Sequence, residues 1–186
     1  MRYDSQQHTI TTERLLLRLF EKADAETVAS HCNNINIYKN TLHLPHPYFL
    51  NDALVWIEPQ RENYKADKFY EFAVTDKESG QIYGTIALSN NRAYQNGEIA
   101  YWIGEPYWGN GYATEAAEAM IQFAFEEKKY HKVFARYFKT NSASGKVLQK
   151  IGMKKEGTLK EHVRKDNRFK DLVYCGIVRG ESALEA

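Results

Sequence analysis

Two kinds of hydrophobic pattern, one typical of strands and one typical of helices, follow each other along this chain. They predict strands mixed with helices. Runs with strand character are "RLLLRLF" (residues 14–20), "FYEFAVTD" (69–76), "QIYGTIALSN" (81–90), "EIAYWI" (98–103), "KVFARYFKT" (132–140) and "LVYCGIVRG" (172–180). Gly80 supplies the turn between the second and third runs. Meanders of this kind, mixed with helices, predict a mixed α+β domain with a central, mostly antiparallel sheet covered by helices.

Helical patterns lie between these strands. We expect short helices in "ADAETVASHC" (23–32) and "SASGKVLQKIG" (142–152), and another from about Asn51 that Pro59 should kink or end. The clearest helix begins at Tyr112 or Ala113. Its apolar face recurs at steps of three and one, with acidic and amide side chains opposite: Ala113, Ala116, Ala117, Met120, Ile121, Ala124 and Phe125 against Glu115, Glu118, Gln122 and Glu126.

Composition adds limits on class and location. The 186 residues contain no repeat or linker, so we expect a single domain over residues 1–186. A net charge of +1 gives no support for direct binding of nucleic acid or a membrane. Cys32 and Cys175 have no paired spacing, which favours reduced thiols in a cytoplasmic protein. The apolar run near the N-terminus is too short for a membrane span.

The stretch "GEIAYWIGEPYWGNGYATEAAEAM" (97–120) runs from a strand through Gly109-Asn110-Gly111 directly into the long helix. A helix N-terminus offers unpaired N–H groups to a phosphate, and glycines let the backbone approach it. A simple tight turn is the alternative. Neither the Rossmann nor the P-loop spacing is present, and no lysine follows the loop. A pyrophosphate bound by backbone amides alone fits coenzyme A better than a nucleoside triphosphate.

These motifs resemble the GNAT superfamily of acyl-CoA-dependent N-acetyltransferases. "EIAYWI…PYWGNGYATEA" followed by "NSASGKVLQKIGM" is most similar to the Rim-type branch, named for enzymes that acetylate the N-termini of ribosomal proteins. The resemblance extends from "TERLLLRLF" through "PYFLNDALVWI" to "DLVYCGIVRGE". It implies acetyl-CoA as co-substrate, helices on both faces of the sheet, and two splayed strands that form a slot for the acyl-CoA.

The resemblance also assigns cofactor-binding residues. The family loop Gln/Arg-x-x-Gly-x-Gly/Ala matches residues 108–113, with a tryptophan in place of the Gln/Arg. The next helix opens with the family's Asn-x-x-Ser, although Asn141 could be only a turn residue and Ser142 or Ser144 only a helix cap. The cofactor contacts implied are Trp102, Ile103, Trp108, Gly109, Asn110, Gly111, Tyr112, Ala113, Thr114, Asn141 and Ser144.

Two catalytic residues follow from the same resemblance. Glu98, at the start of its strand, matches the family's general base, because an amine must lose its proton before it attacks a thioester. The alternative is an ordinary exposed residue at a strand start. Many GNAT enzymes place a proton-donating tyrosine where this chain has Leu148, so Ser144 is the candidate donor to the leaving thiolate. A thiol with a pKa near 8.5 also leaves without a dedicated acid.

The expected acceptor is a primary amine that attacks acetyl-CoA directly, namely a protein N-terminal α-amine. The alternatives are a small-molecule amine (polyamine, antibiotic or amino acid) and a non-catalytic acyl-CoA-binding sensor. Tyr48, Phe49 and Trp56 could shape the acceptor pocket or belong to the core. His43 and His46 lack a third ligand, so no metal site is expected. The basic segment 150–170 is either a solvated hairpin or a surface for an acidic partner. The oligomeric state stays open, a homodimer included.

Overall fold

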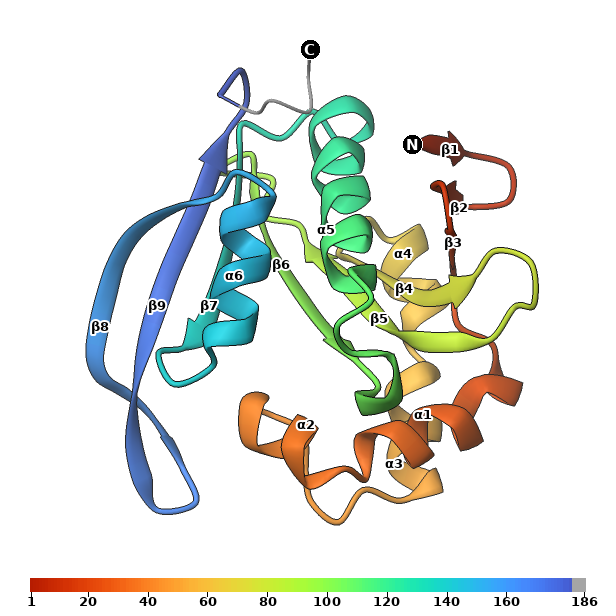
Figure 1. Ribbon diagram of the computed structural model, residues 1–186. Coiled ribbons are helices and arrows are strands. Elements are labelled where there is room, and N and C mark those ends of the chain that lie inside the picture. The colour runs from red at the N-terminus through yellow and green to blue at the C-terminus, as the bar shows by residue number, and fades with distance from the viewer. Residues whose placement is uncertain (182–186) are drawn as a thin grey trace.

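The computed structural model describes residues 1–181 and contains one nine-stranded sheet (Figure 1). The strands lie in the order β1-β2-β3-β4-β5-β6-β7-β9-β8. Their bounds are β1 Arg2–Asp4, β2 Thr9–Thr11, β3 Leu15–Arg18, β4 Phe69–Asp76, β5 Ile82–Ser89, β6 Asn96–Ile103, β7 Lys132–Phe138, β8 Lys154–Lys165 and β9 Arg168–Val178. Every neighbouring pair is antiparallel except β6 with β7. The predicted mixed α+β class and mostly antiparallel sheet are therefore confirmed.

Strands β6 and β7 are paired over only a short distance. Their parallel register joins Asn96 through Glu98 to Lys132 through Phe134 and then stops. Beyond that point β6 stays paired with β5 as far as Ile103, and β7 stays paired with β9 as far as Phe138. The two halves of the sheet diverge from Glu98 onward (Figure 1), so the expectation of two splayed strands is confirmed.

Six α-helices cover the two faces of the sheet. They are α1 Ala25–Cys32, α2 Ile35–Asn40, α3 Leu50–Ile57, α4 Gln60–Lys65, α5 Tyr112–Gln122 and α6 Ser142–Lys150, as counted over residues 1–181. The larger core joins α5 to one face through residues such as Met120, Phe72 and Ile99. The smaller core joins α1 and α3 to the other face through Val28, Ala53 and Ala73. In the part of the chain that is described, none of these helices has the length and apolar character that a membrane crossing requires.

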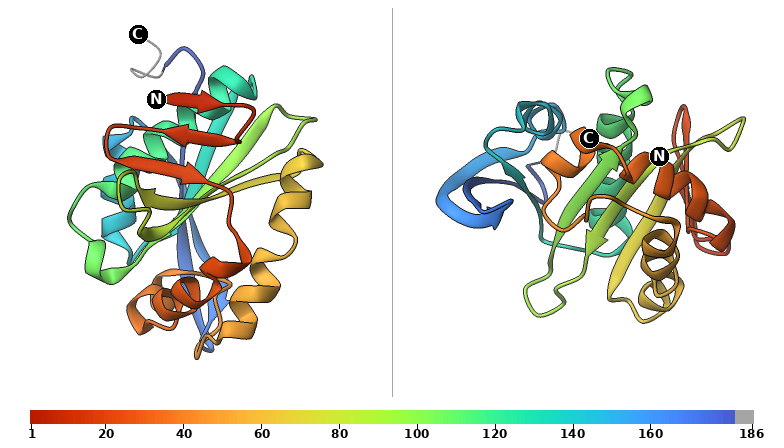
Figure 2. Two further views of the ribbon diagram at one scale, coloured as in Figure 1. Left: turned by 90° about the vertical axis from the view of Figure 1, so that its right-hand side faces the viewer. Right: turned by 90° about the horizontal axis from the view of Figure 1, so that it is seen from below.

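The main departures from the sequence predictions involve short elements. Strands β1 and β2 and helix α2 were not predicted, and each is six residues long or shorter. Figure 2 shows β1, β2 and β3 side by side at one edge of the sheet. Pro59 does follow the end of α3, but it also caps α4, because the first positions of a helix need no N–H donor.

The C-terminal hairpin is anchored at its tip rather than simply solvated. Lys165 is buried, donates to the carbonyl of Thr41, and lies 3.8 Å from the ring centre of Tyr38. Asp166 accepts a hydrogen bond from the Tyr38 hydroxyl. These contacts join the tip of β8 and β9 to α2 and the loop that follows it, all of which lie at the lower end of the molecule in Figure 1, as does α1.

Candidate active site

The glycine loop has the geometry of an anion-binding site. Gly109 and Gly111 have φ angles of 80° and 83°, which side chains with a Cβ rarely adopt, and Gly111 is the N-cap of α5. Within residues 1–181 the backbone N–H groups of Tyr112, Ala113 and Thr114 have no hydrogen-bond acceptor. These are the unpaired donors of a helix N-terminus, where the helix dipole also favours negative charge.

Trp108 holds this loop against β6. Its indole N–H donates to the carbonyl of Ile103 over 2.6 Å. The Asn110 amide donates to the carbonyls of Tyr107 and Trp108 over 3.1 and 3.2 Å. The carbonyl of Ile103 therefore already has one hydrogen-bond partner. Trp102 is paired with Thr85 of β5, the strand on the other side of β6 from β7.

Arg14, a cation that the sequence analysis did not predict at this site, lies beside the glycine loop. Arg14 donates from Nη1 to the carbonyl of Asn110 over 2.9 Å, and from Nε to Glu115 over 2.7 Å. Its guanidinium is 4.9 Å from the ring centre of Tyr112. The side chain remains 46% exposed, so it can still meet a ligand at the loop. No local pattern marks this residue, because it lies 96 positions from Asn110 in the sequence.

Asn141 and Ser144 meet at the start of α6. Asn141 is the N-cap, since its side-chain oxygen accepts the Ser144 backbone N–H over 3.2 Å. The alternative that Ser142 or Ser144 caps the helix is wrong: the Asn141 amide oxygen already occupies that place. Ser144 therefore keeps its hydroxyl for another partner, the hydroxyl of Tyr101 at 2.9 Å. Leu148, at the position of the family's tyrosine, is buried in the core.

Two tyrosines flank the divergence of β6 and β7. Tyr101 is three residues past Glu98, and Tyr137 is three residues past Phe134, the partner of Glu98. Tyr101 reaches Ser144, and the hydroxyl of Tyr137 would lie 2.8 Å from a Cβ added to Gly145. Burial raises the pKa of Tyr101 to about 12, so its phenol stays protonated at neutral pH. Sequence reasoning missed both tyrosines, although strand alternation places each on the α6 face.

Glu98 is not an ordinary exposed residue. Its two carboxylate oxygens accept hydrogen bonds from Nε and Nη2 of Arg136, each over 2.7 Å, and the Glu98 side chain is 22% exposed. Hydrogen bonding to Glu98 raises the pKa of Arg136. The bidentate pair joins β6 to β7 where their backbone pairing ends. If Glu98 acts as the base, it does so with its carboxylate paired to Arg136. The sequence did not predict this pairing.

The other residues predicted around the acceptor separate into core and surface. Tyr48 is buried and Trp56 packs against the smaller core, whereas Phe49 is 62% exposed. His46 packs its ring 5.3 Å from that of Tyr38. Within residues 1–181 no three side chains of metal-binding type lie together.

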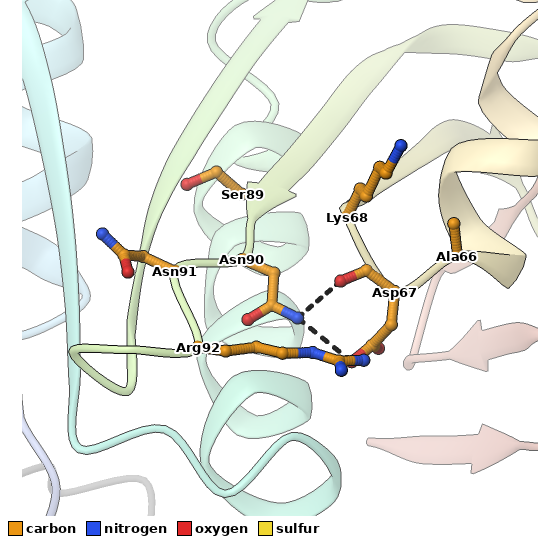
Figure 3. A pocket seen from close by; sticks show the side chains of 7 residues that line it. All are labelled: Ala66, Asp67, Lys68, Ser89, Asn90, Asn91 and Arg92. Carbon is orange, nitrogen blue, oxygen red and sulfur yellow. Dashed lines mark hydrogen bonds and ion pairs between the residues drawn. The ribbon is translucent and has the colours of Figure 1, made fainter.

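An open cavity of about 570 Å³ lies between the start of β4 and the β5–β6 hairpin (Figure 3). Asp67, one of its lining residues, accepts hydrogen bonds from Asn90 and Arg92, and Lys128 pairs with it at 2.8 Å. The charge of Asp67 is thus balanced by two cations from other segments. This cluster fixes the hairpin to the body of the protein.

Comparisons with known proteins agree with this geometry. A family model described as an acetyltransferase (GNAT) domain matches residues 14–154. YnaD of Bacillus subtilis, an uncharacterized N-acetyltransferase, is 31% identical over 173 residues, which cover 92% of this chain and 98% of YnaD. The [ribosomal protein uS5]-alanine N-acetyltransferase of Escherichia coli is 25% identical and covers 90% of this chain and 89% of its own.

Among solved structures, RimJ of Mycobacterium smegmatis in complex with CoA-disulfide superposes with a TM-score of 0.84. It covers 99% of this chain and 95% of its own at 18% identity, which shows a shared fold. Together with the family match, the fold defines an acetyltransferase: the chain belongs to the GNAT family. Within that family it is an N-acetyltransferase, as the resemblance implied.

Proposed function

We propose that this enzyme binds acetyl-CoA and transfers the acetyl group to the α-amine of a protein N-terminus by direct attack. The observation that carries the proposal is the divergence of β6 and β7 immediately after Glu98, on the strand that leads into the glycine loop and the unpaired N–H groups of α5. Beyond Glu98 and Phe134 the facing backbone edges of the two strands are not paired with each other. Such edges are free to hydrogen-bond the amides of a pantetheine arm, as an added strand would.

The residues present fit coenzyme A. The anionic pyrophosphate would meet the backbone of the loop and the first turn of α5, and Arg14 adds a positive charge that the loop motif lacks. Trp102 and Ile103 lie on the β6 edge, where Ile103 already shares its carbonyl with Trp108. Asn141 and Ser144 open α6 on the other side of the divergence. The proposed pyrophosphate contacts are Gly109, Asn110, Gly111, Tyr112, Ala113 and Thr114.

The chemistry needs one proton removed and one returned. A neutral amine attacks the thioester carbonyl, the C–N bond forms, the C–S bond breaks, and CoA leaves as the thiol. Glu98 is the proposed base, with Arg136 holding its carboxylate in place. Ser144 is the proposed donor to the departing sulfur, and Tyr101 can replace the proton on Ser144 through their 2.9 Å contact. The phenol of Tyr101 suits this task, since burial keeps it protonated.

An N-terminal α-amine is the proposed acceptor for two reasons. The E. coli relative is named as an alanine N-acetyltransferase of a ribosomal protein, and its match covers 90% of this chain. An α-amine with a pKa near 8 costs about 1 kcal/mol to deprotonate at pH 7, whereas a lysine near 10.4 costs about 4.6 kcal/mol. A single carboxylate base is therefore sufficient for an α-amine.

The test is release of free thiol from acetyl-CoA with a panel of acceptors. The panel contains peptides with free N-termini, the same peptides with blocked N-termini and an internal lysine, and free polyamines and amino acids. Turnover restricted to free N-termini is the expected result. Faster turnover with a small amine would show that the acceptor is a small molecule rather than a protein N-terminus. Tight acetyl-CoA binding without turnover of any amine would show that the protein is a non-catalytic acyl-CoA sensor.

A further inference from the structure

Glu71 of β4 lies on the same face of the sheet as Glu98. The register pairs Glu71 with Ala87 of β5, and Ala87 with Ala100 of β6. Paired residues share a face, and residues two apart along a strand share it as well. Ala100 therefore points to the face of Glu98 and Trp102, the face that α1 and α3 partly cover.

Small side chains separate Glu71 from the divergence of β6 and β7. Ala87 and Ala100 carry only methyl groups; Ala87 is buried, whereas Ala100 is exposed although β6 is a central strand of the nine. Two strand spacings separate Glu71 from Ala100, which is about 10 Å between backbones. A glutamate side chain covers part of that distance. An amino group lying over Ala100 would thus be within reach of the Glu71 carboxylate.

Glu71 is also a carboxylate without a partner. Within residues 1–181 no hydrogen bond or ion pair reaches it, although it is partly buried. By contrast, Glu98 is held by Arg136 and Glu115 by Arg14. Burial alone raises the pKa of Glu71 to about 8. An unpaired carboxylate in such surroundings opposes folding, so the fold itself gives no reason for an acid here.

The titratable side chain that interacts with Glu71 is Tyr48, from the loop before α3. Cys32 and Asp52 lie around Tyr48 in turn, and none of the three is a cation. A positively charged group that enters this face therefore meets an uncompensated acid at Glu71, and at Glu98 an acid that already has its cation.

We propose that Glu71 is the residue that binds the amino group of the acceptor, and that it selects a primary ammonium at this face of the sheet. The proposal rests on the proposed function. Ammonium and carboxylate come together as an ion pair, and the amine then moves the short distance along β6 toward Glu98 for deprotonation. A cation beside a carboxylate favours its charged form, so an ammonium that binds here should lower the raised pKa of Glu71.

The experiment compares wild type, Glu71→Gln and Glu78→Gln. Glu78 lies exposed in the β4–β5 turn, so its variant makes the same change of charge far from the proposed site. With an N-terminal peptide as acceptor, Glu71→Gln should raise KM for the peptide at least tenfold. Its kcat at saturation and its affinity for acetyl-CoA should stay within about threefold of wild type, and Glu78→Gln should match wild type throughout.

Calorimetry of the same peptide binding to the CoA-loaded proteins gives a readout that does not depend on turnover. Loss of peptide affinity in Glu71→Gln, with an unchanged far-ultraviolet spectrum, supports the proposal. An unchanged KM and peptide affinity would overturn it, and so would a fall in kcat at constant KM. If the wild type acetylates no amine at all, the proposed function itself fails and the assignment of Glu71 fails with it.

Discussion

Replacing Glu71 with glutamine should stabilise the protein by an amount that grows with pH. Burial raises the pKa of Glu71 from an ordinary value of 4.5 to about 8. The folded state therefore holds this proton more tightly than the unfolded state does. Between these two values the unfolded chain gains stability by releasing the proton, so the wild-type free energy of unfolding should fall as pH rises. Glutamine does not titrate, and the variant loses only this pH-dependent contribution.

The magnitude follows from the linkage between pKa and stability. Each pKa unit is worth about 1.36 kcal/mol, so the contribution of Glu71 should change by roughly 3 kcal/mol between pH 5 and pH 8. The amide of glutamine also loses water on burial, which adds a constant penalty that does not depend on pH. The change of the difference with pH is therefore the quantity that isolates the carboxylate.

Urea unfolding of both proteins at pH 5, 6, 7 and 8 measures this difference. Glu78→Gln serves as the control and should differ from wild type by a pH-independent amount. A constant difference for Glu71→Gln would show that Glu71 is well solvated in the folded protein. A wild type that gains stability over the variant as pH rises would reveal a cationic partner for Glu71. Either result would contradict the reasoning from burial.

Three further predictions concern the loop and the proton path. Gly111→Val should abolish acetyl-CoA affinity by calorimetry, because the loop needs a φ of 83° and a close approach of its backbone to the phosphate. The control Gly80→Val, at a φ of 73° with nothing within 4 Å of its Cβ, should bind normally. Equal binding by both variants would show that the loop is not the pyrophosphate site. Ser144→Ala and Tyr101→Phe should lower kcat more than cofactor affinity, and since Asn141 caps α6 through the Ser144 backbone, a melting shift without a kinetic change would argue against proton donation. Glu98→Gln should lower the rate by roughly 10²- to 10⁴-fold at neutral pH, with recovery near pH 8 for an α-amine acceptor or well above 9 for a lysine; wild-type rates from pH 6 to 9 would exclude Glu98 as the base.

The sequence alone determined the elements whose signals are local. The apolar stripe of α5 and the glycines before it predicted the helix and a start at Tyr112 or Ala113, and α5 does start at Tyr112, because helix periodicity and positive φ angles are properties of neighbouring residues. The β4–β5 hairpin and the stop at Pro59 were predicted for the same reason. Strands β1 and β2 were not, since three residues carry too little pattern and Tyr3 packs on Phe123, a distant residue, at 5.0 Å.

Only the tertiary structure decided which side chains share the site. Arg14 reaches the loop at Asn110 across 96 positions, and Arg136 reaches Glu98 across 38. Glu71 joins the face of Glu98 through the register of three strands, which no local pattern encodes. The physical reason is that charge pairing and burial depend on separation in space. Glu98 and Glu71 are both glutamates in the sequence, but the fold pairs the carboxylate of Glu98 with a guanidinium and, among the residues that the structure describes, gives that of Glu71 no partner.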